Sequence, residues 1–189
     1  MARKKQKRKR GIRGLSILVS ILLLVLASAY VLYERLFPME HEETVTTYAK
    51  EYDVDPFLVY AVIHTESRFR EDAVSPAGAI GLMQVTPDTG QFISEQLKLS
   101  SFTEEMLKDP ELNIRMGTWY LSYLKESFPR VETLLAAYNA GPNRVRTWLL
   151  DEEISDGDIL LNIPFAETRD YVERVLQREK IYRLLYFYK

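Results

Sequence analysis

The feature that most constrains this chain is a run of 19 uncharged residues from Leu15 to Tyr33, rich in leucine, isoleucine and valine. A helix of that length spans the hydrocarbon core of a bilayer, which is about 30 Å thick. Eight basic residues and no acidic ones precede the run: Arg3, Lys4, Lys5, Lys7, Arg8, Lys9, Arg10 and Arg13. Such a flank favours a cytoplasmic N-terminus. The sequence therefore predicts a single-pass protein of the cell membrane, with a basic cytoplasmic arm (1–14), a transmembrane helix (15–36) and an extracytoplasmic remainder.

A cleaved signal peptide is the alternative interpretation of the same run, with Ala27-Ser28-Ala29 as its processing site. The apolar residues continue past Ala29 to Tyr33, which is longer than a usual signal core and favours an uncleaved anchor. Residues 37–44, which include Pro38, are then a short linker to the rest of the chain.

The charge of the chain after the arm limits its partners. Beyond position 14 the chain carries 17 basic and 27 acidic residues, a net charge of −10, which argues against nucleic acid as a ligand. There is no cysteine, so disulfides and thiolate metal sites are excluded. With only His41 and His64, no histidine-rich metal motif is present, and no metal or other cofactor is expected.

Residues 45–189 are predicted to form one compact helical domain, all-α with little or no sheet. Three helix starts combine a capping side chain with a following proline: Asp55-Pro56, Thr86-Pro87 and Asp109-Pro110. A helix before Gly141-Pro142, a short helix around Trp148, a polar loop at 151–164 and a long final helix at 165–188 complete the prediction. No alternating strand pattern of useful length occurs.

One of these helices carries a carboxyl group where an apolar residue is expected. Leu58, Ala61, Val62 and Thr65 fall on one helical stripe, and Glu66 takes the next position on it, in the last turn. Removal from water raises the pKa of a carboxyl group, and the negative end of the helix acts in the same direction. Glu66 therefore has the properties of a general acid, although a salt bridge to Arg68 or Arg70 is the ordinary alternative.

The residues after Glu66 are typical of a cleft wall. Ser75-Pro76, Gly78 and Gly81 interrupt any periodicity, and glycines let the backbone approach a ligand closely. Leu82-Met83-Gln84 then presents two apolar groups and one amide.

Three blocks of this sequence resemble the lytic transglycosylases with a soluble-lytic-transglycosylase catalytic domain, a branch of the lysozyme-like superfamily. The blocks are Glu66-Ser67-Arg68-Phe69 with Ala73-Val74-Ser75 and Gly78-Ala79-Ile80-Gly81-Leu82-Met83-Gln84, then Ala137-Tyr138-Asn139-Ala140-Gly141, then Glu167-Thr168-Arg169-Asp170-Tyr171. They stand in the family's order, and the resemblance covers roughly residues 45–188.

The resemblance implies cleavage of the β-1,4 bond between N-acetylmuramic acid and N-acetylglucosamine in peptidoglycan, leaving 1,6-anhydromuramic ends. Glu66 would be the catalytic acid and then the base, without a cofactor. The other family positions would bind substrate or support Glu66: Ser75, Met83, Gln84, Tyr138, Asn139, Glu167 and Tyr171. The alternatives are turn chemistry for Ser75 and Gln84, core packing for Tyr138, a left-handed helix end at Asn139 and an exposed charge at Glu167.

Two further hypotheses remain open at this stage. A muramidase that uses water would share the cleft, and a wall-binding scaffold that has lost activity would share the anchor and the acidic domain. Phe165 departs from the family pattern, which often has tyrosine there. Glycan strands and the membrane are the predicted partners, and the sequence names no protein partner.

Overall fold

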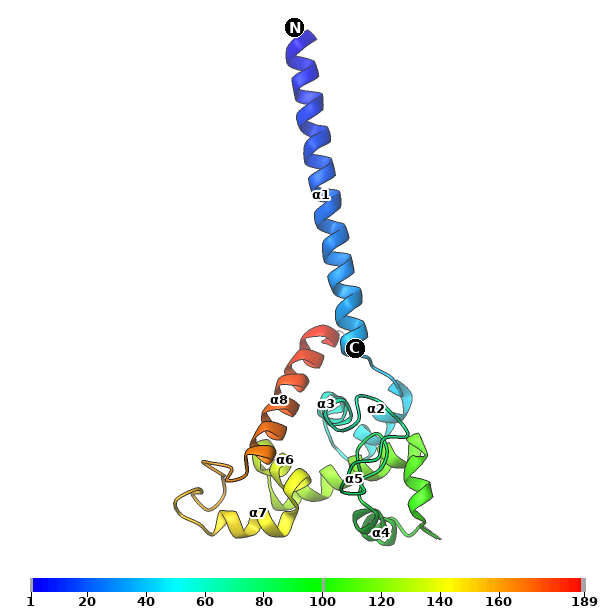
Figure 1. The fold of residues 1–189 in the computed structure, drawn as a ribbon, viewed down its shortest axis with the longest axis vertical. Helices are drawn as coiled ribbons and strands as arrows, with labels where there is room; N and C mark the ends of the chain where they lie inside the picture. Colours follow the sequence, from blue (N-terminus) through cyan, green and yellow to red (C-terminus); the bar gives the residue numbers. More distant parts are fainter. Residues whose placement is uncertain (1, 100, 188–189) are drawn as a thin grey trace. The chain divides into compact units, whose positions relative to one another are not determined.

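The structure is a computed structural model that describes residues 2–99 and 101–187, with side chains from residue 15 onward. It divides into two units, Met1–Pro38 and Met39–Lys189. The first unit is one helix, α1 (Ala2–Leu36), in which Leu15–Leu36 is long and apolar enough to cross a membrane, with a mean hydropathy of 2.7 (Figure 1). The side chains of the predicted basic arm and Tyr188, where the last helix was expected to end, lie outside the described residues.

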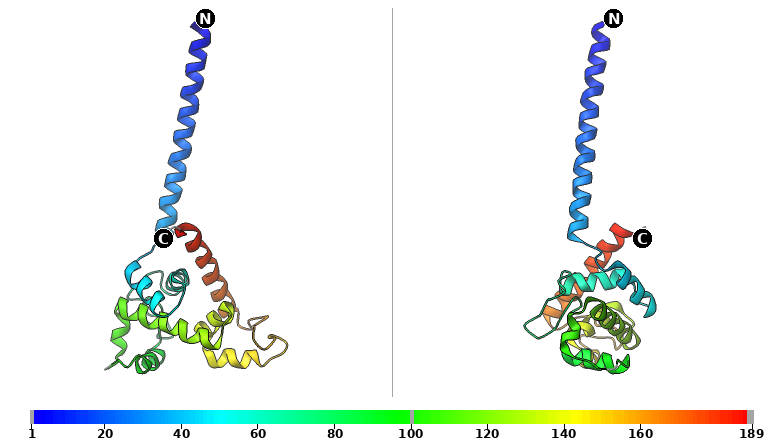
Figure 2. Two further views of the ribbon diagram at one scale, coloured as in Figure 1. Left: turned by 180° about the vertical axis from the view of Figure 1, so that it is seen from behind. Right: turned by 90° about the vertical axis from the view of Figure 1, so that its right-hand side faces the viewer.

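The described part of the second unit is helical and carries no extended sheet, which confirms the predicted all-α class. Its elements are α2 (Glu42–Glu51), α3 (Pro56–Glu66), α4 (Pro87–Gln96), the 3₁₀ helix η1 (Glu104–Lys108), α5 (Pro110–Ser127), α6 (Val131–Ala140), α7 (Pro142–Leu149) and α8 (Ala166–Tyr186). Figure 2 shows the same unit from two further sides.

The three predicted helix starts have the expected capping bonds. The side-chain oxygens of Asp55, Thr86 and Asp109 accept hydrogen bonds from backbone N–H groups of the first turns of α3, α4 and α5, at 2.8, 3.3 and 2.8 Å. In each case the next residue is a proline at the first helical position, where its missing N–H costs nothing. These short sequence signals therefore fix where the main helices begin.

Helix α3 lies at the centre of the unit. Its residues from Leu58 to Ile63 are all buried, so the helix is covered on every side rather than along the single stripe that the spacing predicted. The predicted stripe accounted for only part of this burial. Both α2 and the long α8 pack against α3, and they cover the faces that a surface helix would expose to solvent.

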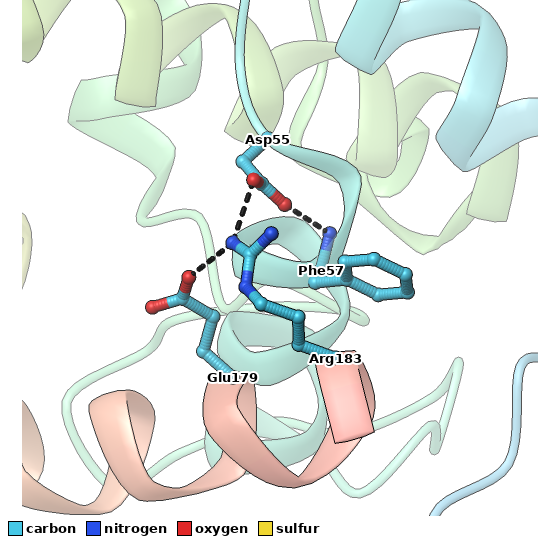
Figure 3. A network of polar contacts seen from close by, with 4 residues as sticks. All are labelled: Asp55, Phe57, Glu179 and Arg183. Carbon is cyan, nitrogen blue, oxygen red and sulfur yellow. Dashed lines mark hydrogen bonds and ion pairs between the residues drawn. The ribbon is translucent and has the colours of Figure 1, made fainter. Parts of the chain in front are cut away.

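A polar network holds α8 against the start of α3 (Figure 3). Arg183 of α8 donates to Asp55 at 2.7 Å and to Glu179 at 2.6 Å, and Asp55 also caps α3 through the N–H of Phe57. The guanidinium group lies over the Phe57 ring, 5.4 Å from its centroid. One arginine thereby links the first turn of α3 to the last turns of α8, and this fixes the alignment of the two helices.

Candidate active site

Glu66 is the last residue of α3, and its carboxyl group is largely removed from water. This burial raises the pKa of Glu66 to about 7, while the Tyr171 hydroxyl and the positive charge of Arg174 act in the opposite direction. The carboxyl group is therefore about half protonated at neutral pH. A group in that state can both donate and accept a proton, as a general acid–base catalyst must.

Two tyrosines face this carboxyl group from different helices, Tyr171 buried and Tyr138 partly buried. Tyr171 comes from α8, and its buried hydroxyl approaches Glu66 without a well-aligned hydrogen bond to any described residue. Tyr138 comes from the end of α6 and donates its hydroxyl to the Met83 carbonyl at 2.8 Å. Burial raises the pKa of both tyrosines well above the ordinary value, and the negative charge of Glu66 adds to the effect. Both therefore stay neutral and can donate hydrogen bonds near the acid.

The loop after α3 is shaped by the predicted turn residues. The Ser75 hydroxyl accepts from the Ala79 N–H at 3.0 Å, and isolated bridges pair Ile80 with Val74 and with Val85. The Gln84 amide donates to the carbonyls of Ala73 at 3.0 Å and Gly81 at 2.9 Å. Ser75 and Gln84 thus perform turn chemistry in the free protein, which leaves the Ser75 O–H and the Gln84 carbonyl oxygen to meet a ligand.

Asn113 of α5 anchors this loop, and the sequence analysis did not select it. Its side chain accepts from the Met83 N–H at 2.7 Å and donates to the carbonyls of Ile80 at 2.9 Å and Leu107 at 2.8 Å. The residue is fully buried. The sequence contains one indication of its role: Asn113 is polar, yet it lies one helical turn before Met116, on the inward face of a predicted helix.

Close packing against Asn113 explains the neighbouring glycine. Gly81 has φ +80°, and a Cβ atom there would lie 2.5 Å from the Leu107 carbonyl oxygen and would also clash with Asn113. Only glycine adopts this positive φ without strain and also lacks the Cβ atom that would clash.

Met83 lies beneath the loop rather than on its surface. Its side chain is fully buried, and it packs against Gly117 of α5, where any Cβ atom would collide with the sulfur. In this conformation Met83 acts on a ligand only through the backbone that it supports. The predicted role of Met83 in shaping a substrate subsite stays a prediction.

Asn139 and Glu167 lie at the exposed edge of the site. Asn139 is helical within α6, and the positive φ of 91° falls on Gly141, so the left-handed alternative for Asn139 is wrong. Glu167 lies in the first turn of α8, on the same face as Tyr171, with its side chain in solvent. Neither side chain has a polar partner among the described residues, and both are exposed and open to a ligand.

A pocket of about 310 Å³ lies beside Tyr120, and none of the predicted site residues lines it. Tyr120, whose ring lies 5.7 Å from that of Tyr138, forms part of its wall. The other lining residues are Asp88, Thr89, Phe92, Tyr123, Pro142, Asn143 and Arg146. The aromatic rings give this pocket a surface suited to the apolar faces of sugars. Within the described residues, no group of three acidic or histidine side chains is arranged to hold a metal ion.

The sequence was compared with protein families and with curated proteins. Residues 43–160 match the family described as Transglycosylase SLT domain. The soluble lytic murein transglycosylase of Salmonella typhimurium is 36% identical over 154 residues, which are 79% of this chain and 24% of that protein. Membrane-bound lytic murein transglycosylase C of Cronobacter sakazakii is 32% identical over 158 residues, which are 71% of this chain and 44% of that protein.

Solved structures show the same relationship. An inactive variant of lytic transglycosylase Slt from Pseudomonas aeruginosa superposes with a TM-score of 0.71 and 39% identity, covering 78% of this chain and 24% of the other. The chain thus spans about a quarter of the length of the soluble enzymes that it matches. The fold is that of a lytic transglycosylase, and the chain belongs to the Transglycosylase SLT domain family.

Proposed function

We propose that this protein is a lytic transglycosylase that cleaves the β-1,4 bond between N-acetylmuramic acid and N-acetylglucosamine in peptidoglycan. The observation that carries the proposal is the carboxyl group of Glu66, which lies partly buried at the end of α3 with a pKa of about 7. In the protonated form it donates its proton to the glycosidic oxygen, so that N-acetylglucosamine leaves as an alcohol. Such a step typically accelerates a reaction by about 10²–10⁴-fold.

The reaction then closes a ring instead of using water. Glycosidases commonly pair two carboxyl groups about 5–9.5 Å apart, but within the described part of the chain no second carboxylate is among the charges that act on the pKa of Glu66. The acetamido group of the muramic acid stabilises the positive charge at C1 in place of a second carboxylate. Glu66, now a carboxylate, accepts the proton of the C6 hydroxyl as its oxygen bonds to C1. The product is a 1,6-anhydro sugar, and Glu66 is again protonated.

The surrounding residues support these two proton transfers. Tyr171 donates a hydrogen bond toward the carboxylate form of Glu66, while Tyr138 holds the loop beside it through the Met83 carbonyl. Ser75 and Gln84 offer a donor and an acceptor to the sugar, while Met83 supports the loop from below. Asn139 and Glu167 contact the glycan at the open edge. A bound glycan that displaces water from Glu66 favours the internal hydroxyl over water.

The N-terminal helix confines the enzyme to the membrane surface. The support is the apolar segment Leu15–Leu36 and the similarity to relatives named membrane-bound lytic murein transglycosylases. In this arrangement residues 1–14 are cytoplasmic, 15–36 span the bilayer, 37–44 are a linker, and 45–189 form the extracytoplasmic catalytic domain. The enzyme then acts on the glycan strands nearest the membrane.

The mass of the products tests the reaction. Purified cell-wall sacculi are digested with the full chain in a non-ionic detergent, and the released muropeptides are analysed by mass spectrometry. Anhydro ends, which lack one water relative to hydrolysis products, are expected from the wild type, with a loss of at least about 10²-fold in Glu66→Gln. Glu71→Gln is the matched control, because Glu71 is exposed and paired with His41 at 3.2 Å. Hydrated ends would identify a muramidase, and binding without turnover would identify a scaffold.

A further inference from the structure

Three arginines lie together beside the candidate acid, and the proposed reaction does not use them. Arg68 follows α3 after one residue and has a left-handed φ of 54°. Arg174 and Arg178 belong to α8, where they stand three and seven positions after Tyr171 and so share its face toward α3. The site therefore has a basic edge formed by the end of α3 and two successive turns of α8.

The side chains of these arginines interact with one another and with residues of the site. Arg178 donates to the hydroxyl of Thr65, the residue before Glu66, at 3.1 Å. The charges of Arg174 and Arg68 act on Arg178 and help lower its pKa, and Arg174 also acts on Glu66. The three positive charges thus occupy one small region next to the reacting carboxyl group.

No acidic side chain in the described residues forms an ion pair with any of the three. Arg183, further along the same helix, shows the contrast, because it is held between Asp55 and Glu179 (Figure 3). The lack of acidic partners at these three arginines does not reflect a general shortage of acidic residues, because residues 39–189 contain 26 acidic and 16 basic residues, a net charge of −10. Three cations without carboxylate partners in so acidic a domain form a site that is electrostatically prepared for an external anion.

We propose that Arg68, Arg174 and Arg178 bind carboxylate groups of the peptide carried by the muramic acid at the cleaved bond. This inference rests on the proposed function, because it concerns the same substrate. The two N-acetylated sugar rings are uncharged, and the carboxylates of peptidoglycan belong to its peptides, which start from C3 of muramic acid. Arginine pairs with carboxylates through two parallel N–H bonds. The enzyme is therefore selective for glycan that still carries its peptides.

The spacing of the arginines suits a peptide chain. Arg174 and Arg178 are four residues apart on α8, which corresponds to about 6 Å along a helix axis. An extended peptide advances about 3.3–3.6 Å per residue, so carboxylates two residues apart in the peptide match that separation. Arg68 completes the basic edge on the α3 side of the acid.

A binding measurement separates this inference from the reaction itself. The full chain carrying Glu66→Gln, in non-ionic detergent, is titrated with three soluble glycan preparations. One has intact peptides, and one has its peptide carboxylates converted to amides. The third has its peptides removed by an amidase and the lactyl carboxyl group that this frees converted to an amide. The expected result is at least fivefold tighter binding of the intact form than of the other two, and a preference that weakens as salt is raised.

Two further variants in the Glu66→Gln background locate the effect. Arg68→Gln/Arg174→Gln removes two exposed charges and is expected to abolish the preference for free carboxylates. Lys180→Gln is the matched control, because Lys180 is an exposed cation elsewhere on α8, and it should keep the preference. Circular dichroism of each variant verifies that the helices are retained.

Equal binding of the intact and amidated forms would overturn the inference, and so would a preference that survives in the double arginine variant. Cleavage of sacculi by the wild type is scored separately. If that cleavage is absent while the carboxylate preference depends on the arginines, the proposed reaction fails and the anion site stands.

Discussion

The environment of one carboxyl group carries the chemistry at the scale of single residues. The sequence predicted a glutamate on an inward helical stripe, and the structure shows a buried carboxyl group with a pKa of about 7. What the sequence could not provide is the set of groups that face it. Tyr171 and Arg174 lie more than a hundred residues away along the chain, and only the packing of α8 on α3 brings them to Glu66.

Burial of Glu66 makes the stability of the protein depend on pH. The pKa of this carboxyl group is raised from 4.5 to about 7 on folding, so the folded state binds the proton more tightly than the unfolded state. The stabilisation is fully present below about pH 4.5 and is lost as the pH rises through 7. We expect Glu66→Gln to be more stable than the wild type at pH 8 by roughly 2–3 kcal/mol, with little difference at pH 4.5.

Urea unfolding at both pH values measures this difference, with Glu71→Gln as a control that removes an exposed carboxyl group. A stability gap that is the same at pH 4.5 and pH 8 would contradict the assignment of a raised pKa to Glu66. The expected gap also means that the candidate acid costs the fold stability at neutral pH, as active-site groups commonly do.

At the scale of elements, the helix starts were predictable and the burial of α3 was not. Capping residues followed by proline act within a few positions, so Asp55, Thr86 and Asp109 could be identified without tertiary information. The all-round burial of α3 depends on which helices pack against it. The sequence also could not show that Ser75 and Gln84, which were predicted to bind substrate, make hydrogen bonds within the loop in the free protein.

Asn113 links α5 to the loop that forms the site wall. Asn113→Ala removes three buried hydrogen bonds, those to the Met83 N–H and to the carbonyls of Ile80 and Leu107, and of the two carbonyls that of Ile80 keeps a bond from the Val85 N–H. We expect a loss of roughly 2–4 kcal/mol in the free energy of unfolding, together with faster hydrogen exchange of the loop amides. Urea unfolding and exchange mass spectrometry measure the two effects.

Asn143→Ala is the comparison variant for Asn113→Ala. The wild-type Asn143 side chain is exposed and accepts a single hydrogen bond from Arg146. That change is expected to cost less than about 0.5 kcal/mol. Equal effects of the two substitutions, or an unchanged exchange rate at Met83, would show that the loop is held by other contacts.

At the scale of the whole molecule, the sequence suggested a division between an anchor and a catalytic domain. The structure separates Met1–Pro38 from Met39–Lys189, and the family match begins at residue 43. The finer division into an arm (1–14), a transmembrane helix (15–36), a linker (37–44) and a catalytic domain (45–189) stays a prediction. The side of the membrane on which each part lies is set by charge and lipid, and it remains a proposal.

The anchor predicts how the protein fractionates. The full chain should sediment with membranes and resist extraction by high salt, because an apolar segment of 22 residues is held by the bilayer core rather than by charge. Protease added to intact spheroplasts should degrade residues 39–189 and spare a tag at the N-terminus. Release of the full chain by salt, or protection of the C-terminal unit, would contradict the proposed topology.

The whole account depends on the protonation state of Glu66, and a direct titration measures it. With glutamate labelled by ¹³C at the side-chain carboxyl carbon, NMR spectra of the wild type are recorded from pH 3 to pH 9, and Glu66→Gln identifies the resonance. One carboxyl group that titrates near pH 7, well separated from the exposed glutamates, is the predicted result. A Glu66 resonance that titrates at or below the ordinary value of 4.5 would contradict the proposed acid.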